Sequence, residues 1–432
     1  MPRPVHPGPD VARLAEPVSR ANAVKRVLMV AYHFPPLAGS SGIQRTLRFV
    51  QQLPAHGWQA LVLTTKAMAY EQVSADLDAE VPAGTKVERA FALDTARHLA
   101  VRGRHLGALA RPDRWMTWKY DAVRRGLRLI REQRPQAIWS TYPIATAHAI
   151  GAELQRASGL PWIADFRDPM AQEGYPADPA TWRQFSAIES NAAERASLCT
   201  FTTPSAQRTY CQRYPAHAAR MRLLENGYDE GSFTQAEQRA HAAGPLQPGR
   251  TVLLHSGIVY PSERDPTRLF EALARIRQRG PSPLRVRFRA AVHEDLLKGL
   301  AIEYGVQDMV EVMPSLPYVQ ALEEMVRADG LLLLQASNCN EQIPAKLYEY
   351  LRAARPILCL SDFAGDTWNV LHSAGLEHGA ALDNAAQIDE LLSRLVASGP
   401  QGLLPRIDAI AAASRAGRSR QLAQWLDAVA TP

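Results

Sequence analysis

The sequence predicts an α/β protein built from two doubly wound halves, each with a mostly parallel sheet covered by helices. Short apolar runs alternate with longer segments of helical periodicity along most of the 432 residues. The alternation breaks at a polar segment, residues 234–250, and then restarts. The break predicts a linker between two domains that face a cleft, and sheets of this kind bind ligands beyond the carboxyl ends of their strands.

The first half opens with the apolar run 26–32, which predicts a buried strand because parallel strands are covered on both faces. After the loop 33–42, apolar residues recur at helical spacing as far as Leu53. Further strands are predicted at 60–64, 137–141, 162–166, 199–203 and 222–225, and helices at 120–133, 144–157, 181–197 and 204–214.

The second half repeats the alternation. Strands are predicted at 251–256, 284–290, 330–335 and 356–360, and helices at 266–279, 294–304, 317–328 and 344–353. The last helix, near 413–430, has no strand after it. The expected division is a disordered tail at 1–24, domains at 25–235 and 236–412, and the final segment 413–432.

Composition restricts the class of protein. Hydrophobic residues make up 46% and charged residues 21%, a normal globular balance. No apolar run reaches the roughly 18 residues that a membrane span needs, and residues 1–24 lack the apolar core of a signal peptide. The four cysteines show no metal-ligand spacing, so we expect no bound metal and free thiols in a reducing cytoplasm.

The net charge of +6 is unevenly distributed. Eleven lysines and arginines face three acids in the segment 97–134, and Trp115 and Trp118 lie in its middle. Basic residues beside interfacial tryptophans bind anionic membrane surfaces, which predicts peripheral contact with the inner face of the cytoplasmic membrane. A solvated basic face is an equally open interpretation. Nucleic acid has less support, because no binding motif accompanies the charge.

The segment after the strand 330–335 carries the most chemistry. Pro344 suits the first turn of a helix, Glu341 lies in the loop before it, and Lys346 and Glu349 fall three apart on one helical face. A helix start behind a strand is an anion site, a lysine there can hold phosphate, and a glutamate can accept hydrogen bonds from ribose hydroxyls. This arrangement favours a nucleotide sugar, although a surface Lys–Glu pair on an ordinary amphipathic helix has the same spacing.

Three loops after other predicted strands could face the same cleft. The loop after the first strand contains Gly39, Ser40, Ser41 and Gly42, which let a backbone approach a ligand closely, and its spacing is neither that of a Walker loop nor that of a dinucleotide fingerprint. A plain connecting turn is the alternative.

Asp165, Arg167 and Asp168 follow a later strand and could orient an acceptor hydroxyl or act as a base, with Asp168 as a catalytic candidate. A salt bridge that shapes the loop is the alternative. Gly257 and Arg264 follow the first strand of the second half, where Arg264 is a candidate phosphate ligand or a surface partner of Asp265. Asn226-Gly227 is a turn signal that we interpret as structural.

Together these stretches resemble the GT-B glycosyltransferases of family four, which are retaining nucleotide-sugar transferases. The resemblance covers about residues 25 to 412. It rests on five stretches in family order: the loop 32–45, Asp165 to Pro169, Asn226 to Asp229, Gly257 to Pro266, and the glutamates 341 and 349.

The resemblance implies a role for each position. Glu341 would contact donor-sugar hydroxyls, Glu349 would hold the ribose, and Arg264 would neutralise the leaving phosphate. The amides of Gln342, Ile343, Pro344 and Ala345 would face the diphosphate together with Lys346, and the loop 39–42 would approach the donor from the first domain. No cofactor or metal is implied, the donor phosphate would take the acceptor proton, and the last helix would cross back to the first domain.

The chain departs from the family at two positions. Ile258 stands where many members carry an arginine, and the first loop lacks an adjacent glycine pair. The histidine that many members place near the donor sugar is His33 or His148, and His33 is favoured because it follows a strand.

The expected function is transfer of a hexose to a glycan or lipid-linked acceptor in cell-surface polysaccharide biosynthesis. A nucleotide-sugar epimerase on the same fold and an inactive glycan- or nucleotide-binding scaffold are the alternatives.

Overall fold

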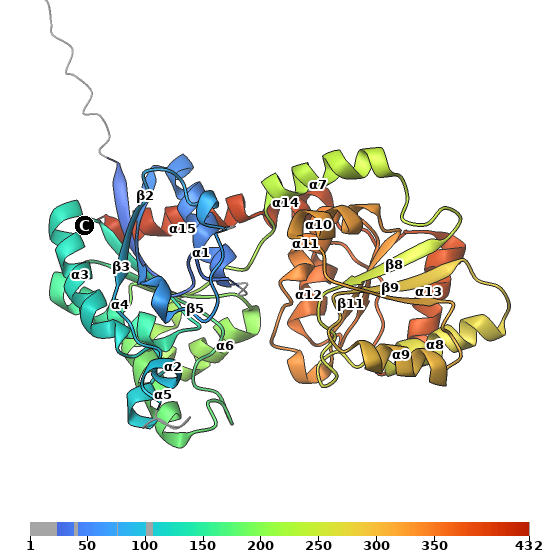
Figure 1. Ribbon diagram of the computed structural model, residues 1–432, viewed down its shortest axis with the longest axis horizontal. Helices are drawn as coiled ribbons and strands as arrows, with labels where there is room; N and C mark the ends of the chain where they lie inside the picture. Colours follow the sequence, from blue (N-terminus) through green and yellow to red (C-terminus); the bar gives the residue numbers. More distant parts are fainter. Residues whose placement is uncertain (1–23, 39–41, 76, 101–106, 432) are drawn as a thin grey trace, which may run out of the picture.

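The protein consists of two α/β domains that face each other (Figure 1). The computed structural model describes residues 24–38, 42–75, 77–100 and 107–431. The predicted tail 1–24 therefore lies outside the described residues except for Val24, and so do Gly39, Ser40 and Ser41.

The N-terminal domain contains a seven-stranded parallel sheet with the order β3-β2-β1-β4-β5-β6-β7. Its strands are β1 (Lys25–Val30), β2 (Trp58–Thr65), β3 (Lys86–Ala90), β4 (Ala137–Thr141), β5 (Trp162–Arg167), β6 (Leu198–Phe201) and β7 (Met221–Leu223). Its helices are α1 (Gly42–Gln52), α2 (Thr95–His98), α3 (Trp118–Gln133), α4 (Ala145–Ser158), α5 (Pro179–Arg195) and α6 (Pro204–Arg213).

The C-terminal domain contains a five-stranded parallel sheet with the order β10-β9-β8-β11-β12. Its strands are β8 (Thr251–Ser256), β9 (Leu284–Arg289), β10 (Val310–Met313), β11 (Gly330–Leu334) and β12 (Ile357–Leu360). Its helices are α7 (Glu230–Ala243), α8 (Thr267–Gln278), α9 (Glu294–Glu303), α10 (Tyr318–Arg327), α11 (Lys346–Ala353), α12 (Asp366–Ser373), α13 (Ala385–Ser398) and α14 (Ile407–Ala412). The doubly wound fold class is confirmed for both halves.

The strand orders fix where ligands bind. The chain reverses direction across the N-terminal sheet between β1 and β4, and across the C-terminal sheet between β8 and β11. Such switch points open a crevice at the carboxyl ends of the two central strands, because the connections leave them in opposite directions. The loops after β1, β8 and β11 are those that the sequence singles out.

Two strands of the structure are not predicted from the sequence. Both β3 and β10 lie at sheet edges, and their sequences KVERA and VEVM mix charged with apolar residues. Edge strands are half solvated and lack the continuous apolar run that reveals a central strand.

The predicted linker 234–250 is wrong over its first part, because α7 continues through Ala243. Tyr228 and Phe233 pack into the C-terminal core together with Leu322 and Leu347. The C-terminal domain therefore begins near Tyr228, before the predicted boundary at residue 236.

The last helix, α15 (Arg415–Ala430), returns to the N-terminal domain, where it lies in red across the blue elements (Figure 1). Leu422 and Leu426 are fully buried against Leu47 and other residues of that domain's core. Trp58 also donates a hydrogen bond of 2.8 Å to Asp427. The predicted crossing helix is confirmed.

The two crossings between the domains run side by side. The amide of Tyr228 donates to the carbonyl of Ala413 at 3.2 Å, and the amide of Arg415 donates to the carbonyl of Tyr228 at 2.9 Å. A β-carbon on Gly227 would lie 2.7 Å from the Ala413 carbonyl oxygen, closer than real β-carbons approach. Glycine at 227 therefore lets the two segments touch.

Candidate functional site

Lys346 is held at the switch point of the C-terminal sheet. Its ammonium nitrogen lies 3.1 Å from Nε2 of His255, the penultimate residue of β8. Nδ1 of His255 lies 2.9 Å from the carbonyl oxygen of Leu332 and must carry the proton, so Nε2 is the acceptor for Lys346. Gly257 follows with φ 114°, and a β-carbon there would lie 3.1 Å from the Lys346 nitrogen. Glycine at 257 thus gives the lysine its room.

Burial controls the charge of Lys346. Burial first, and the nearby Arg264 second, lower its pKa to about 7, while Glu349 opposes the shift. Burial and Lys346 also lower the pKa of His255, so His255 stays neutral. A phosphate beside Lys346 would favour the charged form, because an opposite charge raises the pKa of an amine.

Arg264 lies close to this lysine. Its guanidinium donates a 2.8 Å hydrogen bond to the carbonyl oxygen of Ile258 and lies 5.2 Å from the ring centre of Tyr260. These contacts hold a fixed cation at the carboxyl edge of the sheet. The structure therefore brings Lys346, Gly257 and Arg264 together, as the sequence predicts.

The segment before α11 differs from the prediction. The helix begins at Lys346 and not at Pro344. The amide of Gln342 donates to the Cys339 carbonyl at 2.9 Å, and Pro344 has no amide hydrogen. The expectation that all amides from 342 to 345 face a diphosphate is wrong at these two positions, which leaves the amides of Ile343 and Ala345. Glu341 lies exposed in the preceding loop.

Glu349 lies in a cavity between the two domains. It accepts a 2.8 Å hydrogen bond from the hydroxyl of Tyr318, and burial raises its pKa above the usual range. The cavity has a volume of about 340 Å3. Its lining comes from both domains and from the crossing helix: Gln44, Arg45, Arg48, Phe49, Arg167, Glu225, Asn226, Gly227, Tyr318, Ala345, Glu349, Arg415 and Arg418.

A buried ion pair forms the N-terminal wall of this cavity. Arg45 of α1 binds both carboxylate oxygens of Asp165, at 2.7 and 2.9 Å. The hydroxyls of Thr141 and Thr200 each donate to Asp165 at 2.7 Å. Burial alone would raise the pKa of Asp165, but Arg45 outweighs it and the pKa lies below the usual range.

Asp165 is fully buried, so its predicted contact with an acceptor is wrong. The salt-bridge interpretation holds, but with Arg45 as the partner of Asp165 in place of an arginine of the same loop.

Arg167, His33 and Gly42 meet where the first loop joins α1. A β-carbon on Gly42 would lie 2.4 Å from His33 Nδ1 and 3.0 Å from Arg167 Nη1. Burial, aided by Arg167, lowers the pKa of His33 to about 4, so this imidazole is neutral near pH 7. Arg167 has a left-handed backbone, φ 64°, and its carbonyl accepts hydrogen bonds from Thr202.

The other two predicted residues, Asp168 and His148, differ in their exposure to solvent. Asp168 is exposed and accepts a 3.3 Å hydrogen bond from the Thr202 hydroxyl. His148 is fully buried, with Nδ1 2.8 Å from the Ser140 hydroxyl. This burial excludes His148 and leaves His33 as the histidine near the cleft.

The basic segment is less suited to a membrane than its sequence indicates. Trp118 is fully buried and Trp115 packs on Tyr32 with ring centres 4.6 Å apart, so the interfacial role predicted for these tryptophans is wrong. Arg125 pairs with Asp121 at 2.6 Å. Part of the segment, residues 101–106, lies outside the described residues. No helix in the described part of the chain is long and apolar enough to cross a membrane.

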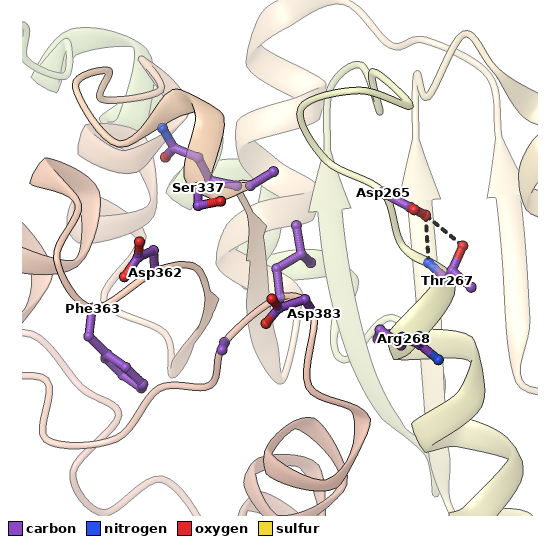
Figure 2. A pocket seen from close by; sticks show the side chains of 11 residues that line it. Asp265, Thr267, Arg268, Ser337, Asp362, Phe363 and Asp383 are labelled. Atoms are coloured by element: carbon purple, nitrogen blue, oxygen red, sulfur yellow. Dashed lines mark hydrogen bonds between the residues drawn. The ribbon is translucent and has the colours of Figure 1, made fainter.

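Figure 2 shows a second cavity, of about 560 Å3, beside the start of α8. Asp265, Asp362 and Asp383 line it with one arginine, Arg268. Asp265 accepts two bonds from Thr267, which fixes the turn into the helix. Its acidic lining disfavours a polyanion, so an anionic ligand is favoured at Lys346 instead.

Three residues of the site were not assigned from sequence. His255 supports Lys346, Tyr318 binds Glu349, and Arg415 of α15 donates to the carbonyl of Gly227 at 2.8 Å. His255 lies two residues before Gly257, so its place beside that loop is a usable signal in the sequence. Tyr318 and Arg415 come from elements distant in sequence, and no local pattern points to them. Among the described residues, no three histidine, cysteine or acidic side chains gather as metal ligands.

The Asp165–Arg45 pair gives a test of this architecture. We expect Asp165→Asn to destabilise the N-terminal domain by about 3–5 kcal/mol, because it leaves Arg45 buried without its counter-charge. Urea denaturation followed by circular dichroism measures the loss. Asp408→Asn, which alters the exposed pair with Arg406, is the control and should change stability by less than about 0.5 kcal/mol. Equal stability of both variants would contradict the structural role of the buried pair.

Comparisons with known proteins agree with this geometry. Residues 41–227 match the family model described as a glycosyl transferase 4-like domain. A comparison with the sequences of curated proteins finds no match.

Solved structures share the fold along nearly the whole chain. HepE of Anabaena, solved with UDP and glucose, has a TM-score of 0.62 at 14% identity, over 94% of this chain and 100% of HepE. Sucrose-phosphate synthase from Thermosynechococcus elongatus has a TM-score of 0.57 at 13% identity, over 94% of this chain and 96% of that one. A UDP-N-acetylglucosamine 2-epimerase has a TM-score of 0.54 at 13% identity, over 93% of this chain and 95% of that one.

The two parallel sheets, the crossing helix and these likenesses define the GT-B fold. Residues 41–227 match a glycosyl transferase 4-like domain, and the whole chain has the fold of the GT-B glycosyltransferases.

Proposed function

We propose that this enzyme transfers a hexose from a nucleotide-diphosphate sugar to a glycan or lipid-linked acceptor, with retention of the anomeric configuration, in cell-surface polysaccharide assembly. The observation that carries the proposal is the placement of Lys346 and Glu349 on successive turns of α11, at the switch point and in the interdomain cavity. HepE, which has the same fold, is solved with UDP-glucose, which supports a UDP-sugar as the first donor to test.

The charges around Lys346 suit departure of a diphosphate. In the proposed reaction the bond from the anomeric carbon to the donor phosphate breaks, and a bond to the acceptor oxygen forms on the same face. The acceptor proton passes to a phosphate oxygen, and Lys346 and Arg264 stabilise the charge that develops on the diphosphate. These cations do the work that a metal ion does elsewhere, so we propose that the reaction needs no metal.

The acceptor is proposed to enter from the N-terminal domain. Asp168 is exposed beside Arg167, and neutral His33 lies close to the same arginine. A neutral imidazole can accept a hydrogen bond from a sugar hydroxyl or donate one to it. Glu341, exposed in the loop before α11, is proposed to contact the donor sugar.

The donor class can be identified by a thermal-shift panel of UDP, GDP, ADP and their common sugars, with and without EDTA. A ligand that binds only the folded protein raises its melting temperature. We expect one nucleotide to stabilise the protein, and we expect the shift to survive EDTA. No shift with any nucleotide would contradict the proposal and favour the scaffold alternative, whereas interconversion of the sugar without an acceptor would favour the epimerase.

Lys346 gives binding a characteristic pH dependence. Its pKa of about 7 means that the ammonium charge is lost as pH rises through neutrality. We expect affinity for the donor sugar nucleotide to fall roughly tenfold or more from about pH 6 to about pH 8.5, measured by calorimetry. Lys346→Ala should weaken binding by about 1.5–3 kcal/mol.

Lys346→Arg is the matched variant, because a guanidinium stays charged throughout this range. Its affinity, whatever its absolute value, should show no comparable trend with pH. An identical pH profile in the wild type and in Lys346→Arg would remove Lys346 as the titrating group.

The lipid-linked part of the proposal rests on the basic face of α3 and predicts binding to anionic vesicles at low salt. Arg131 is exposed there, and each basic residue near such a surface contributes about 1 kcal/mol. Arg131→Glu should therefore weaken sedimentation with phosphatidylserine vesicles several-fold, whereas Arg420→Glu on α15, also exposed, should not. A wild-type protein that ignores these vesicles would refute the membrane contact.

A further inference from the structure

Tyr318 occupies an unusual position relative to Glu349. It is the first residue of α10, 31 positions before Glu349, yet its hydroxyl donates a 2.8 Å hydrogen bond to that carboxylate. Both side chains line the 340 Å3 cavity between the domains, and Tyr318 remains 40% exposed. The cavity therefore presents an aromatic ring directly beside the carboxylate.

The Tyr318 hydroxyl donates to Glu349 the same kind of hydrogen bond that a sugar hydroxyl would donate. A carboxylate withdrawn from water needs donors, and the phenol supplies one of them. A ribose hydroxyl is a donor of the same kind and would compete for the same oxygen. If Glu349 holds the ribose, as expected from its place one turn after Lys346, Tyr318 must share that carboxylate or release it.

The ring of Tyr318 offers a second contact. A base attached to a ribose at Glu349 lies within a few ångströms of the ribose, in the same cavity as this ring. Aromatic rings stack on every nucleobase, because each base has a π-face. The remaining polar groups nearby are suited to a base edge or a phosphate: Gln44 lines the cavity, and Arg415 donates to its amide oxygen at 3.3 Å.

The end of the cavity that Tyr318 and Glu349 line, called here the Tyr318 end, suits a neutral group because most of the arginines around it are paired with acids. Arg45 is paired with Asp165, Arg418 with Glu225, and Arg48 with Glu80 at 2.7 Å. Arg415 faces the Glu349 carboxylate, which offsets its charge. These pairs reduce the attraction of the Tyr318 end for a polyanion, whereas Lys346 and Arg264 lie at the switch point. A nucleoside therefore fits the Tyr318 end, with its diphosphate directed toward Lys346.

On the basis of the function proposed above, we propose that Tyr318 positions the donor nucleotide. Its ring packs against the nucleobase, and its hydroxyl gives up Glu349 to a ribose hydroxyl. Tyr318 is thus a donor-binding residue that acts outside the chemical step.

Two substitutions separate the ring from the hydroxyl. Tyr318→Ala removes both and should weaken binding of the nucleoside diphosphate that stabilises the wild type most by roughly 5- to 150-fold, the range found for loss of one stacked base. Tyr318→Phe keeps the ring and removes the competitor for Glu349, so its affinity should equal or exceed that of the wild type. Isothermal calorimetry measures both.

Inorganic pyrophosphate tests the location of the effect. It lacks base and ribose, so its affinity should be the same in the wild type and in Tyr318→Ala. In steady-state assays Tyr318→Ala should raise KM for the donor and change kcat little, because the missing contact is made equally before and during reaction. Tyr120→Ala on α3, where the tyrosine is 72% exposed, is the matched control and should change none of these values.

The outcomes distinguish this inference from the function on which it rests. If the wild type binds no nucleotide, the proposed function fails. If the wild type binds a nucleotide and Tyr318→Ala binds it equally well, Tyr318 does not position it. Loss of affinity in Tyr318→Phe as large as in Tyr318→Ala would assign the effect to the hydroxyl and also overturn the inference. Melting temperatures of all variants, measured without nucleotide, show whether each is folded.

Discussion

The N-terminal side of the site depends on the buried pair of Arg45 and Asp165. The carboxylate is anchored by hydroxyls from β4 and β6, and the guanidinium extends to the carbonyl of Leu224 at 2.9 Å. One ion pair therefore ties α1 to three strand ends and to the segment that leaves for the other domain. Such a pair is costly to bury and costlier to break, since either partner alone would be an uncompensated charge. It fixes the start of α1, where Gly42 touches His33 and Arg167.

On the C-terminal side of the site, the buried cation is Lys346, and it is not paired with a carboxylate in the way that Arg45 is. Lys346 has a neutral imidazole and another cation as its neighbours, and its pKa near 7 leaves it only partly charged. Binding of a phosphate would complete its charge. The site thus combines a wall built on a buried ion pair on one domain with an incompletely compensated cation on the other. Charge compensation by the ligand favours a polyanion over a neutral sugar in this position.

The sequence predicts the central strands well because they are apolar on both faces, and it predicts Lys346 and Glu349 because they lie on one short helix. It misses β3 and β10, edge strands whose charged residues interrupt the apolar pattern. It also misses the whole of α7, where polar composition hides a helix. The partner of Asp165 lies 120 residues away and that of Glu349 lies 31 away, separations that local patterns do not encode.

The side-by-side crossing at Gly227 also governs how the two domains can move. Because both connecting segments are hydrogen-bonded to each other at one point, a relative rotation of the domains pivots there, and atomic displacements grow with distance from that pivot. Arg415 and Asn226, which line the cavity, lie next to the pivot, whereas the contact between Ser205 and Asp366 lies on a different pair of helices. Opening would therefore separate the two domains least near Gly227 and most at the margin farthest from it. The part of the cavity lined by Arg415 and Asn226 would keep its shape while the outer margin widens, which gives ligand exchange a route that leaves this part of the cavity intact.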